Sequence, residues 1–291
     1  MRLDGRRESS NVEDRRRLSG GQKAGVGGIG AIIIAALFAY MSGGNPLEAG
    51  LQAAQQQMTA QTETVDGENF TEEEQELASD CKKILASTED VWSQVFEQNG
   101  WGNYTPPTLV LFSNQVSSAC GSASAAVGPF YCSGDQKLYV DLSFFTQMKR
   151  QLGVEGNTFA YAYVIAHEIG HHIEYLTGTL GKAHQAMSQT DQTSANQISV
   201  RLELLADYYA GVWAHYEDKM KQSLEYGDLE KGLELAKAIG DDWLQKKARG
   251  RAVPESFTHG TSDQRKRWLK AGYQTGDMRT STFDVRNYND L

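Results

Sequence analysis

The sequence has little positive charge beyond its first 23 residues. Residues 1–23 carry seven basic and four acidic side chains and therefore sum to +3. Because the whole chain of 291 residues has a formal net charge of −9, the rest of it sums to −12. An acidic body of this kind repels the phosphates of DNA and RNA. We therefore expect no nucleic acid among the partners of this protein.

Charge of either sign is absent between Lys23 and Glu48, a stretch that contains the apolar run AGVGGIGAIIIAALFAYM at residues 24–41. As a helix, this run would span roughly 27 Å, close to the thickness of a bilayer core. A cleaved signal peptide is the alternative, but its basic region would be unusually long and rich in acidic residues, and no A-x-A cleavage site follows. We expect an uncleaved transmembrane helix at residues 24–42.

Basic side chains gather before this apolar run, and none follows it until Lys82. The positive-inside rule then predicts a cytoplasmic basic tail at residues 1–23. It places everything after the anchor outside the cytoplasm, in the periplasm or at the cell surface.

Cysteine is scarce, with only Cys81, Cys120 and Cys132 in the chain. An oxidising compartment permits disulfides, and a short loop rich in Gly, Ser and Ala separates the last two cysteines. We expect a Cys120–Cys132 bridge and a buried, free Cys81. Three buried free thiols are the alternative.

No internal repeat divides the chain after its apolar run. Residues 43–70 are polar and show no periodic apolar face, which indicates a flexible linker. Residues 71–291 are expected to form one domain of the α+β class, mainly helical with a small sheet, beginning with a T-x-x-E capping box at Thr71 and Glu74. The expected strands are 108–114 and 137–142, and the expected helices are 71–99, 143–152, 157–178, 194–220, 229–248 and 264–276.

The stretch VIAHEIGHHIEYL, at residues 164–176, carries two histidines four positions apart. On a helix, His167 and His171 lie about 40° apart in azimuth and roughly 6 Å apart along the axis, so both imidazoles can bind one ion. Glu168 lies beside them, where it can reach a water on the metal without ligating the metal. This is the HExxH arrangement of zinc peptidases, and a core helix with incidental histidines is the alternative.

Two histidines hold a zinc ion incompletely, so a third ligand is needed. The metzincin extension would require a histidine at position 177, which is Thr, and His172 points about 100° away from His171 on a regular helix. The segment LELLADYYAG at residues 202–211 supplies carboxylates in an apolar setting, where charge needs a reason to be buried. We expect Glu203 to be the third ligand and Asp207, one turn later, to hydrogen-bond a ligand histidine.

Four long motifs and the N-terminal GRRESSNVEDRR resemble the bacterial neutral zinc metallopeptidase family; the motifs are HEIGHHIE, LELLADYYAGVWAH, GPFYCSGDQKLYVDLSFF and FTHGTSDQRKRWLKAGYQTGD. More distantly, the chain resembles the gluzincins. The resemblance implies a zincin-like domain, Glu203 as a ligand and Asp207 beside the ligands. Leu205 and Tyr208 stand where Gln and Cys are usual in the family, which affects the expected substrate fit rather than zinc binding.

The same resemblance implies that residues 128–142 bind substrate, because gluzincins hold a peptide against an edge strand beside the active helix. A hairpin closed by a disulfide, with no such role, is the alternative. His259, in the polar loop THGTS, is a candidate for stabilising the developing oxyanion, and Arg265 is a weaker candidate. A lone histidine is more often a surface or capping residue.

These observations predict a membrane-anchored, extracytoplasmic zinc endopeptidase that binds one zinc ion per chain and acts on peptides or proteins. His167, His171 and Glu203 would bind the metal, and Glu168 would be the general base. A zinc-binding scaffold that has lost turnover, and a metal-free helical membrane protein, are the alternatives. The sequence does not indicate an oligomeric state.

Overall fold

The computed structural model describes residues 1–16, 70–124, 128–154 and 157–291. The expected anchor at residues 24–42 lies outside the described residues, as does nearly all of the linker at residues 43–70. Among the residues that are described, none of the helices combines the length and the apolar character that crossing a membrane requires.

A four-stranded sheet has the strand order β1-β2-β6-β5, and its members are β1 (Val12–Asp14), β2 (Thr108–Phe112), β6 (Lys137–Asp141) and β5 (Phe130–Cys132). The first three strands are parallel, whereas β5 runs antiparallel to β6 and, within the described residues, pairs with no strand on its other edge. A separate antiparallel hairpin consists of β3 (Gln115–Ser118) and β4 (Gly121–Ser124). The two strands expected from the sequence are confirmed, and the other four were not predicted.

Alternating side chains of β2 and β6 pack on opposite faces, as strand geometry requires. Leu109 and Leu138 belong to the main hydrophobic core, which they share with the helices. Val110 and Tyr139 point the other way, into a smaller cluster with Val116 of the hairpin. The sheet is therefore buried on both faces, which accounts for the continuous apolar character of these two strands.

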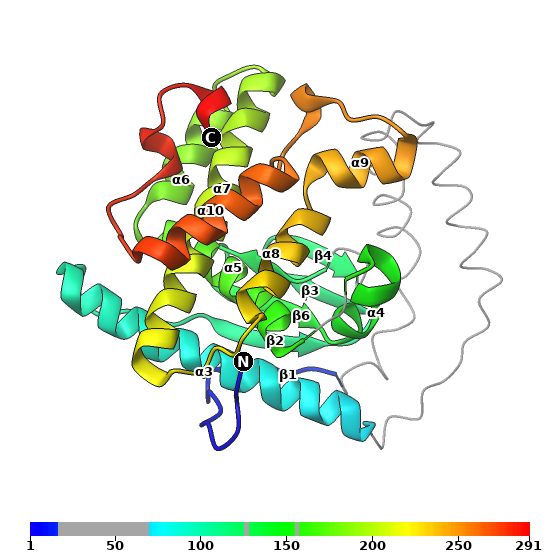
Figure 1. The fold of residues 1–291 in the computed structure, drawn as a ribbon, viewed down its shortest axis with the longest axis vertical. Helices are drawn as coiled ribbons and strands as arrows, with labels where there is room; N and C mark the ends of the chain where they lie inside the picture. Colours follow the sequence, from blue (N-terminus) through cyan, green and yellow to red (C-terminus); the bar gives the residue numbers. More distant parts are fainter. Residues whose placement is uncertain (17–69, 125–127, 155–156) are drawn as a thin grey trace.

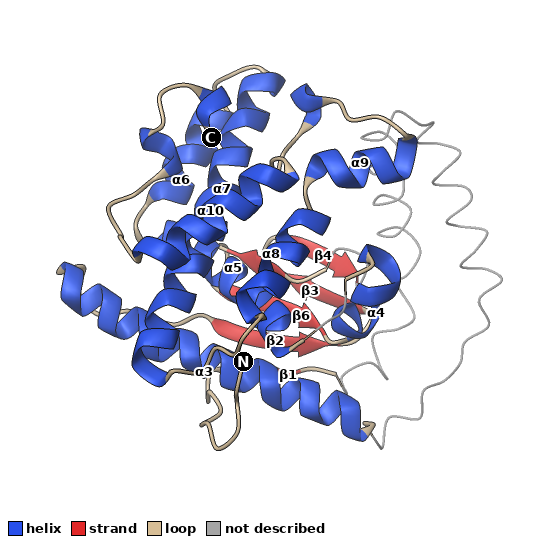
Figure 2. Cartoon of the chain, in the orientation of Figure 1, coloured by secondary structure: helices blue, strands red, loops and turns tan. Residues whose placement is uncertain are grey.

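The helices are α3 (Glu72–Asn99), α4 (Ser143–Leu152), α5 (Thr158–Leu176), α6 (Thr179–Met187), α7 (Gln192–Lys221), α8 (Asp228–Ala238), α9 (Asp241–Arg249) and α10 (Ser262–Thr275), with short 3-10 turns at Pro254–Ser256, Thr282–Asp284 and Tyr288–Asp290. Figure 2 shows α7 and α10 together on one side of the sheet and α3 on another. The mainly helical α+β class is confirmed. So is the capping box of α3, in which Thr71 and Glu74 bond each other's backbone.

The single helix expected over residues 229–248 is wrong, because it breaks into α8 and α9 at Gly240. A Cβ atom at Gly240 would lie 2.4 Å from the backbone nitrogen of Ser262, so the chain passes too close to the start of α10 for an uninterrupted helix with side chains there. The backbone N–H of Asp241 then bonds Gly260 at 2.9 Å. Helix α6 was not predicted.

Glycines let the helices that carry the candidate site approach closely. A Cβ atom at Gly170 of α5 would lie 2.8 Å from the Cα of Ala206 on α7. Where α7 crosses α10, a Cβ atom at Gly272 would lie 2.0 Å from the carbonyl oxygen of Tyr208. Only glycine permits these approaches, which bring three helices together around one point.

The cysteine predictions are confirmed. Cys120 and Cys132 form a disulfide that ties the end of β5 to the start of β4, and Cys81 is a free, buried residue of the core.

The separate basic tail expected at residues 1–23 is wrong for its described part. Residues 1–16 pack on the domain, and β1 is a strand of its sheet. Figure 1 shows this N-terminal segment, in blue, alongside α3. The segment docks because the domain offers it buried carboxylates and an unpaired strand edge, neither of which is visible in the composition of the tail.

Candidate metal centre

Three side chains from two helices converge on one point. His167 and His171 come from α5 and Glu203 comes from α7. The Nε2 of His167 lies 3.2 Å from one carboxylate oxygen of Glu203, and the Nε2 of His171 lies 3.5 Å from the other. One ligand atom from each residue can be chosen so that all three lie within 4.8 Å of one another, which is the geometry of a site that could hold a metal ion.

The remaining nitrogen of each histidine is held by a buried carboxylate. The Nδ1 of His167 lies 2.8 Å from Asp207, and the Nδ1 of His171 lies 2.9 Å from Glu174. With a carboxylate oxygen as the acceptor, each Nδ1 carries the hydrogen, and each Nε2 is directed at Glu203. Such partners fix the ring orientation and the tautomer of metal-binding histidines.

Asp207 is itself firmly held. Arg265 of α10 donates to both of its oxygens, at 2.8 and 3.0 Å, and the hydroxyl of Tyr163 donates at 2.6 Å. Burial would raise the pKa of Asp207, but Arg265 and His167 outweigh it and lower that pKa to about 2. Asp207 is therefore a fixed negative charge, and Arg265 acts on the site through it.

The electrostatics of the cluster favour a cation at its centre. Burial lowers the pKa of His167, but Asp207 and Glu203 overcome this effect and raise the pKa to about 9. The pKa of His171 is also well above its ordinary value, because Glu174 and Glu203 outweigh burial. Surrounding carboxylates thus stabilise positive charge between the two rings, and a divalent ion is the alternative to protons there.

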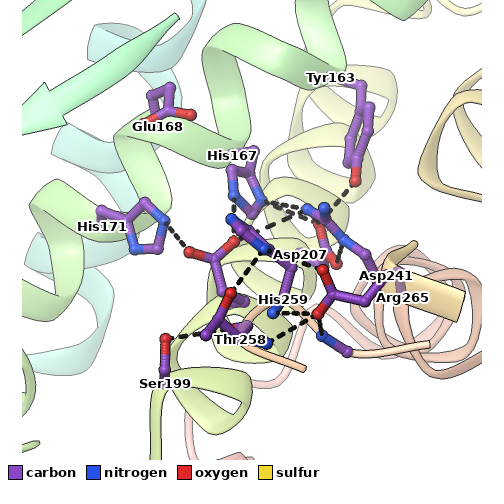
Figure 3. Close-up of polar contacts among 12 residues, drawn as sticks. Tyr163, His167, Glu168, His171, Ser199, Asp207, Asp241, Thr258, His259 and Arg265 are labelled. Atoms are coloured by element: carbon purple, nitrogen blue, oxygen red, sulfur yellow. Dashed lines mark hydrogen bonds and ion pairs between the residues drawn. The ribbon is translucent and has the colours of Figure 1, made fainter. Parts of the chain in front are cut away.

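Glu168 lies on the side of α5 that faces the sheet. Its carboxylate accepts a hydrogen bond of 2.8 Å from the backbone N–H of Tyr131 in β5. Figure 3 shows Glu168 on the opposite side of His167 from Arg265. The side chain is half-buried, and burial raises the pKa of its carboxyl despite the two neighbouring histidines. A raised pKa suits a group that accepts and then returns a proton near neutral pH.

His172 does not join the cluster, as expected from its position on the helix. It is fully buried, and its two nitrogens bond the hydroxyl of Tyr131 and the carbonyl oxygen of Thr105, both at 2.8 Å. Burial lowers the pKa of His172 to about 4, so the ring is neutral. It anchors the residue of β5 whose backbone holds Glu168.

His259 lies in the loop before α10, near the cluster, where the charge of Glu203 contributes to raising its pKa although burial opposes the rise. Asp241 organises this loop by accepting hydrogen bonds from the backbone N–H groups of Thr258, His259 and Gly260, at 2.8, 2.7 and 3.1 Å. Asp241 also lies 3.3 Å from the Nδ1 of His259, whose side chain is 48% exposed. The imidazole can therefore meet a bound molecule.

The structure thus brings together all of the residues proposed from the sequence: His167, Glu168, His171, Glu203 and Asp207, with His259 and Arg265 at the periphery. Three participants were missed, namely Glu174, Tyr163 and Asp241. Glu174 follows His171 by three positions, and Tyr163 precedes His167 by four, so helical spacing could have indicated both. Asp241 reaches the site through a loop contact that no local pattern reveals.

Comparison with known proteins shows similarity along most of the chain. The chain is 44% identical over 292 residues to "Uncharacterized protein YpfJ" of Escherichia coli strain K12, an alignment that covers 95% of this chain and 96% of the relative. It is 42% identical over 208 residues to "Uncharacterized protein Mb2605" of Mycobacterium bovis, covering 68% of each chain.

No solved structure matches this chain. The family described as "Putative neutral zinc metallopeptidase" matches residues 1–283, which is nearly the whole sequence. That match includes the helices that carry the histidine–carboxylate cluster, and the chain belongs to this family of zinc metallopeptidases.

Proposed function

We propose that this protein is a zinc-dependent endopeptidase whose metal ligands are His167, His171 and Glu203. The observation that carries the proposal is the convergence of two Nε2 atoms on one carboxylate, with both Nδ1 atoms already held by other carboxylates. Two imidazoles and one carboxylate form the donor set of catalytic zinc sites that keep one position open. The residues present therefore fit zinc.

When bound in such a site, zinc supplies Lewis acidity, which lowers the pKa of a water and polarises a carbonyl group. Glu168 would take the proton of the attacking water and deliver it to the amine nitrogen that leaves. Its burial and its fixed contact with Tyr131 support this role, since both hold a carboxylate with a raised pKa beside the ligands. His259 would donate a hydrogen bond to the oxyanion that develops on the scissile carbonyl.

The open edge of β5 would bind the substrate as an extended strand. β5 is the last strand of its sheet, it contacts α5, and the disulfide of Cys132 ties down its end. A peptide added to this edge would run between the strand and the helix that carries Glu168. Peptides or unfolded proteins are therefore the proposed substrate class.

Membrane attachment through residues 24–42 remains part of the proposal, supported by the length and composition of the apolar run at residues 24–41. An extracytoplasmic location of the domain is supported by the Cys120–Cys132 disulfide, since such bonds persist in oxidising compartments.

Removal and return of the metal test the proposed activity. The purified full-length chain should cleave an unfolded protein substrate, lose the activity to a chelator, and regain it with one equivalent of zinc. His171→Ala should abolish cleavage. His184→Ala, a matched change at an exposed histidine of α6, should have no effect. Cleavage that survives metal removal would refute the proposal, and stoichiometric zinc binding without cleavage of any substrate would favour the scaffold alternative.

A further inference from the structure

The N-terminal segment, residues 1–16, contributes to the interior of the domain. Residues Val12, Glu13 and Asp14 pair in parallel register with Leu109, Val110 and Leu111 of β2. Met1 and Leu3 are only 6% exposed and belong to the main hydrophobic core. These contacts are of the kind that hold a domain together, rather than those of a tail resting on a surface.

A buried carboxylate on α7 depends on this segment for its counter-charge. Glu217 is fully buried, and the guanidinium of Arg6 lies 2.6 Å from its Oε1. The hydroxyls of Ser87 and Ser223 donate the other hydrogen bonds, at 2.6 and 2.8 Å. If Arg6 were elsewhere, the carboxylate of Glu217 would lie in the core without its cation partner, which is strongly unfavourable.

A second carboxylate, on α3, has the same dependence. Glu89 is 8% exposed, and it accepts hydrogen bonds from Ser9 at 2.5 Å and from Asn11 at 2.7 Å. Arg7 lies 2.9 Å from its other oxygen and also pairs with Asp90. Every one of these three donors belongs to the N-terminal segment, so the domain helices carry a site built to receive it.

The two ends of the undescribed stretch between residues 16 and 70 meet at one place. The guanidinium of Arg16 lies 4.0 Å from the ring centroid of Phe70, and it donates to the carbonyl oxygen of Glu74 at 3.2 Å. The chain therefore leaves the domain and returns to it at the same point of the surface.

We infer that residues 1–16 and 70–291 form one folded unit, which lies on a single side of any membrane that residues 24–41 contact. A single crossing by that apolar run would place the two parts in different compartments and separate Arg6 from Glu217 and the N-terminal donors from Glu89. A topology with the N-terminus in the cytoplasm and the domain outside it is incompatible with these contacts.

Labelling of single cysteines tests this inference in the full-length chain. The native cysteines are either buried or bonded to each other, so an introduced exposed cysteine is the group that should react with a membrane-impermeant maleimide. Ser10→Cys reports on the N-terminal segment, and Tyr226→Cys reports on the domain, because both positions are exposed. In spheroplasts that express each variant, the two cysteines should be both labelled or both protected, and lysis should make both reactive.

If one cysteine is labelled in intact spheroplasts and the other reacts only after lysis, the inference is overturned.

A second measurement tests the folded unit directly. Arg6→Ala should lower the Tm of the purified full-length chain by roughly 5–10 °C, since it leaves Glu217 buried and unpaired. Arg279→Ala, at an arginine whose side chain is 88% exposed, is the matched control and should leave the Tm near that of the wild type. Equal Tm values for the two variants would show that the segment is not part of the fold.

Discussion

Glu174→Gln replaces the buried carboxylate behind one proposed metal ligand, His171, by a neutral amide. Glu174 is fully buried and accepts the Nδ1 hydrogen of His171 at 2.9 Å. The amide keeps the shape of the side chain, and its oxygen can still accept this bond, but the bond is no longer charge-assisted. Partners of this kind contribute about 10–100-fold to metal affinity, and the full burial of Glu174 removes solvent screening, so we expect a loss in that range. It corresponds to about 1.4–2.7 kcal/mol in zinc binding.

The substitution should also destabilise the metal-free protein. The second oxygen of Glu174 is buried without a hydrogen-bond partner in the described part of the chain. An amide nitrogen in its place would be a buried unsatisfied donor, which costs about 1–3 kcal/mol. Loss of zinc affinity and a lower Tm of the metal-free protein should therefore occur together.

Competition with a zinc-sensitive chelator measures the affinity, and thermal unfolding measures the stability. Glu234→Gln is the matched control, because Glu234 is a glutamate with a 56% exposed side chain that pairs with Lys231 on the surface of α8. It should alter neither quantity. Wild-type zinc affinity in Glu174→Gln would refute the conclusion that this carboxylate orients His171.

Two further predictions concern the framework of the site. Gly170→Ala would place a Cβ atom 2.8 Å from the backbone of Ala206, so α5 and α7 must move apart. We expect the Tm to fall by several degrees and zinc binding to weaken, both measured on the same samples. Unchanged values of both quantities would refute the close crossing. Cys132→Ser removes the disulfide that closes a loop of about 12 residues. It should lower the free energy of unfolding by roughly 3 kcal/mol, measured by denaturant titration against the oxidised wild type. A change well under ~1 kcal/mol would mean that the bond contributes little to the stability of the fold.

The candidate ligands could be predicted from the sequence because each helix carries its own local signal. Residues four apart on a helix share a face, so His167 and His171 had to converge once their segment was helical. Glu203 and Asp207 stood out because carboxylates among leucines and tyrosines need a buried partner. Glu174 obeys the same helical rule, because it follows His171 by three positions and lies on the same face of α5.

Other features depend on contacts between distant segments and leave no local signal. The break between α8 and α9 follows from the approach of Gly240 to Ser262, and the composition of residues 229–248 is compatible with one continuous helix. Asp241 becomes part of the site only because that break turns α9 toward the loop of His259. The composition of the N-terminal segment shows its arginines and therefore indicates a basic tail. It does not show the buried carboxylates that pair with them, which lie roughly 80 to 210 residues away along the chain.

Glu168→Gln in the full-length chain tests the central claim most directly. The amide keeps the volume of the side chain and leaves the three proposed ligands in place, so the variant should bind one zinc per chain with near wild-type affinity. It cannot take a proton from water, and general acid–base catalysis contributes about 10²–10⁴-fold, so cleavage of an unfolded protein substrate should fall at least that far. Zinc content and cleavage rate, measured on the same preparation, decide the matter. Normal zinc with lost cleavage is the predicted result, and full zinc-dependent cleavage by Glu168→Gln would contradict the proposed mechanism.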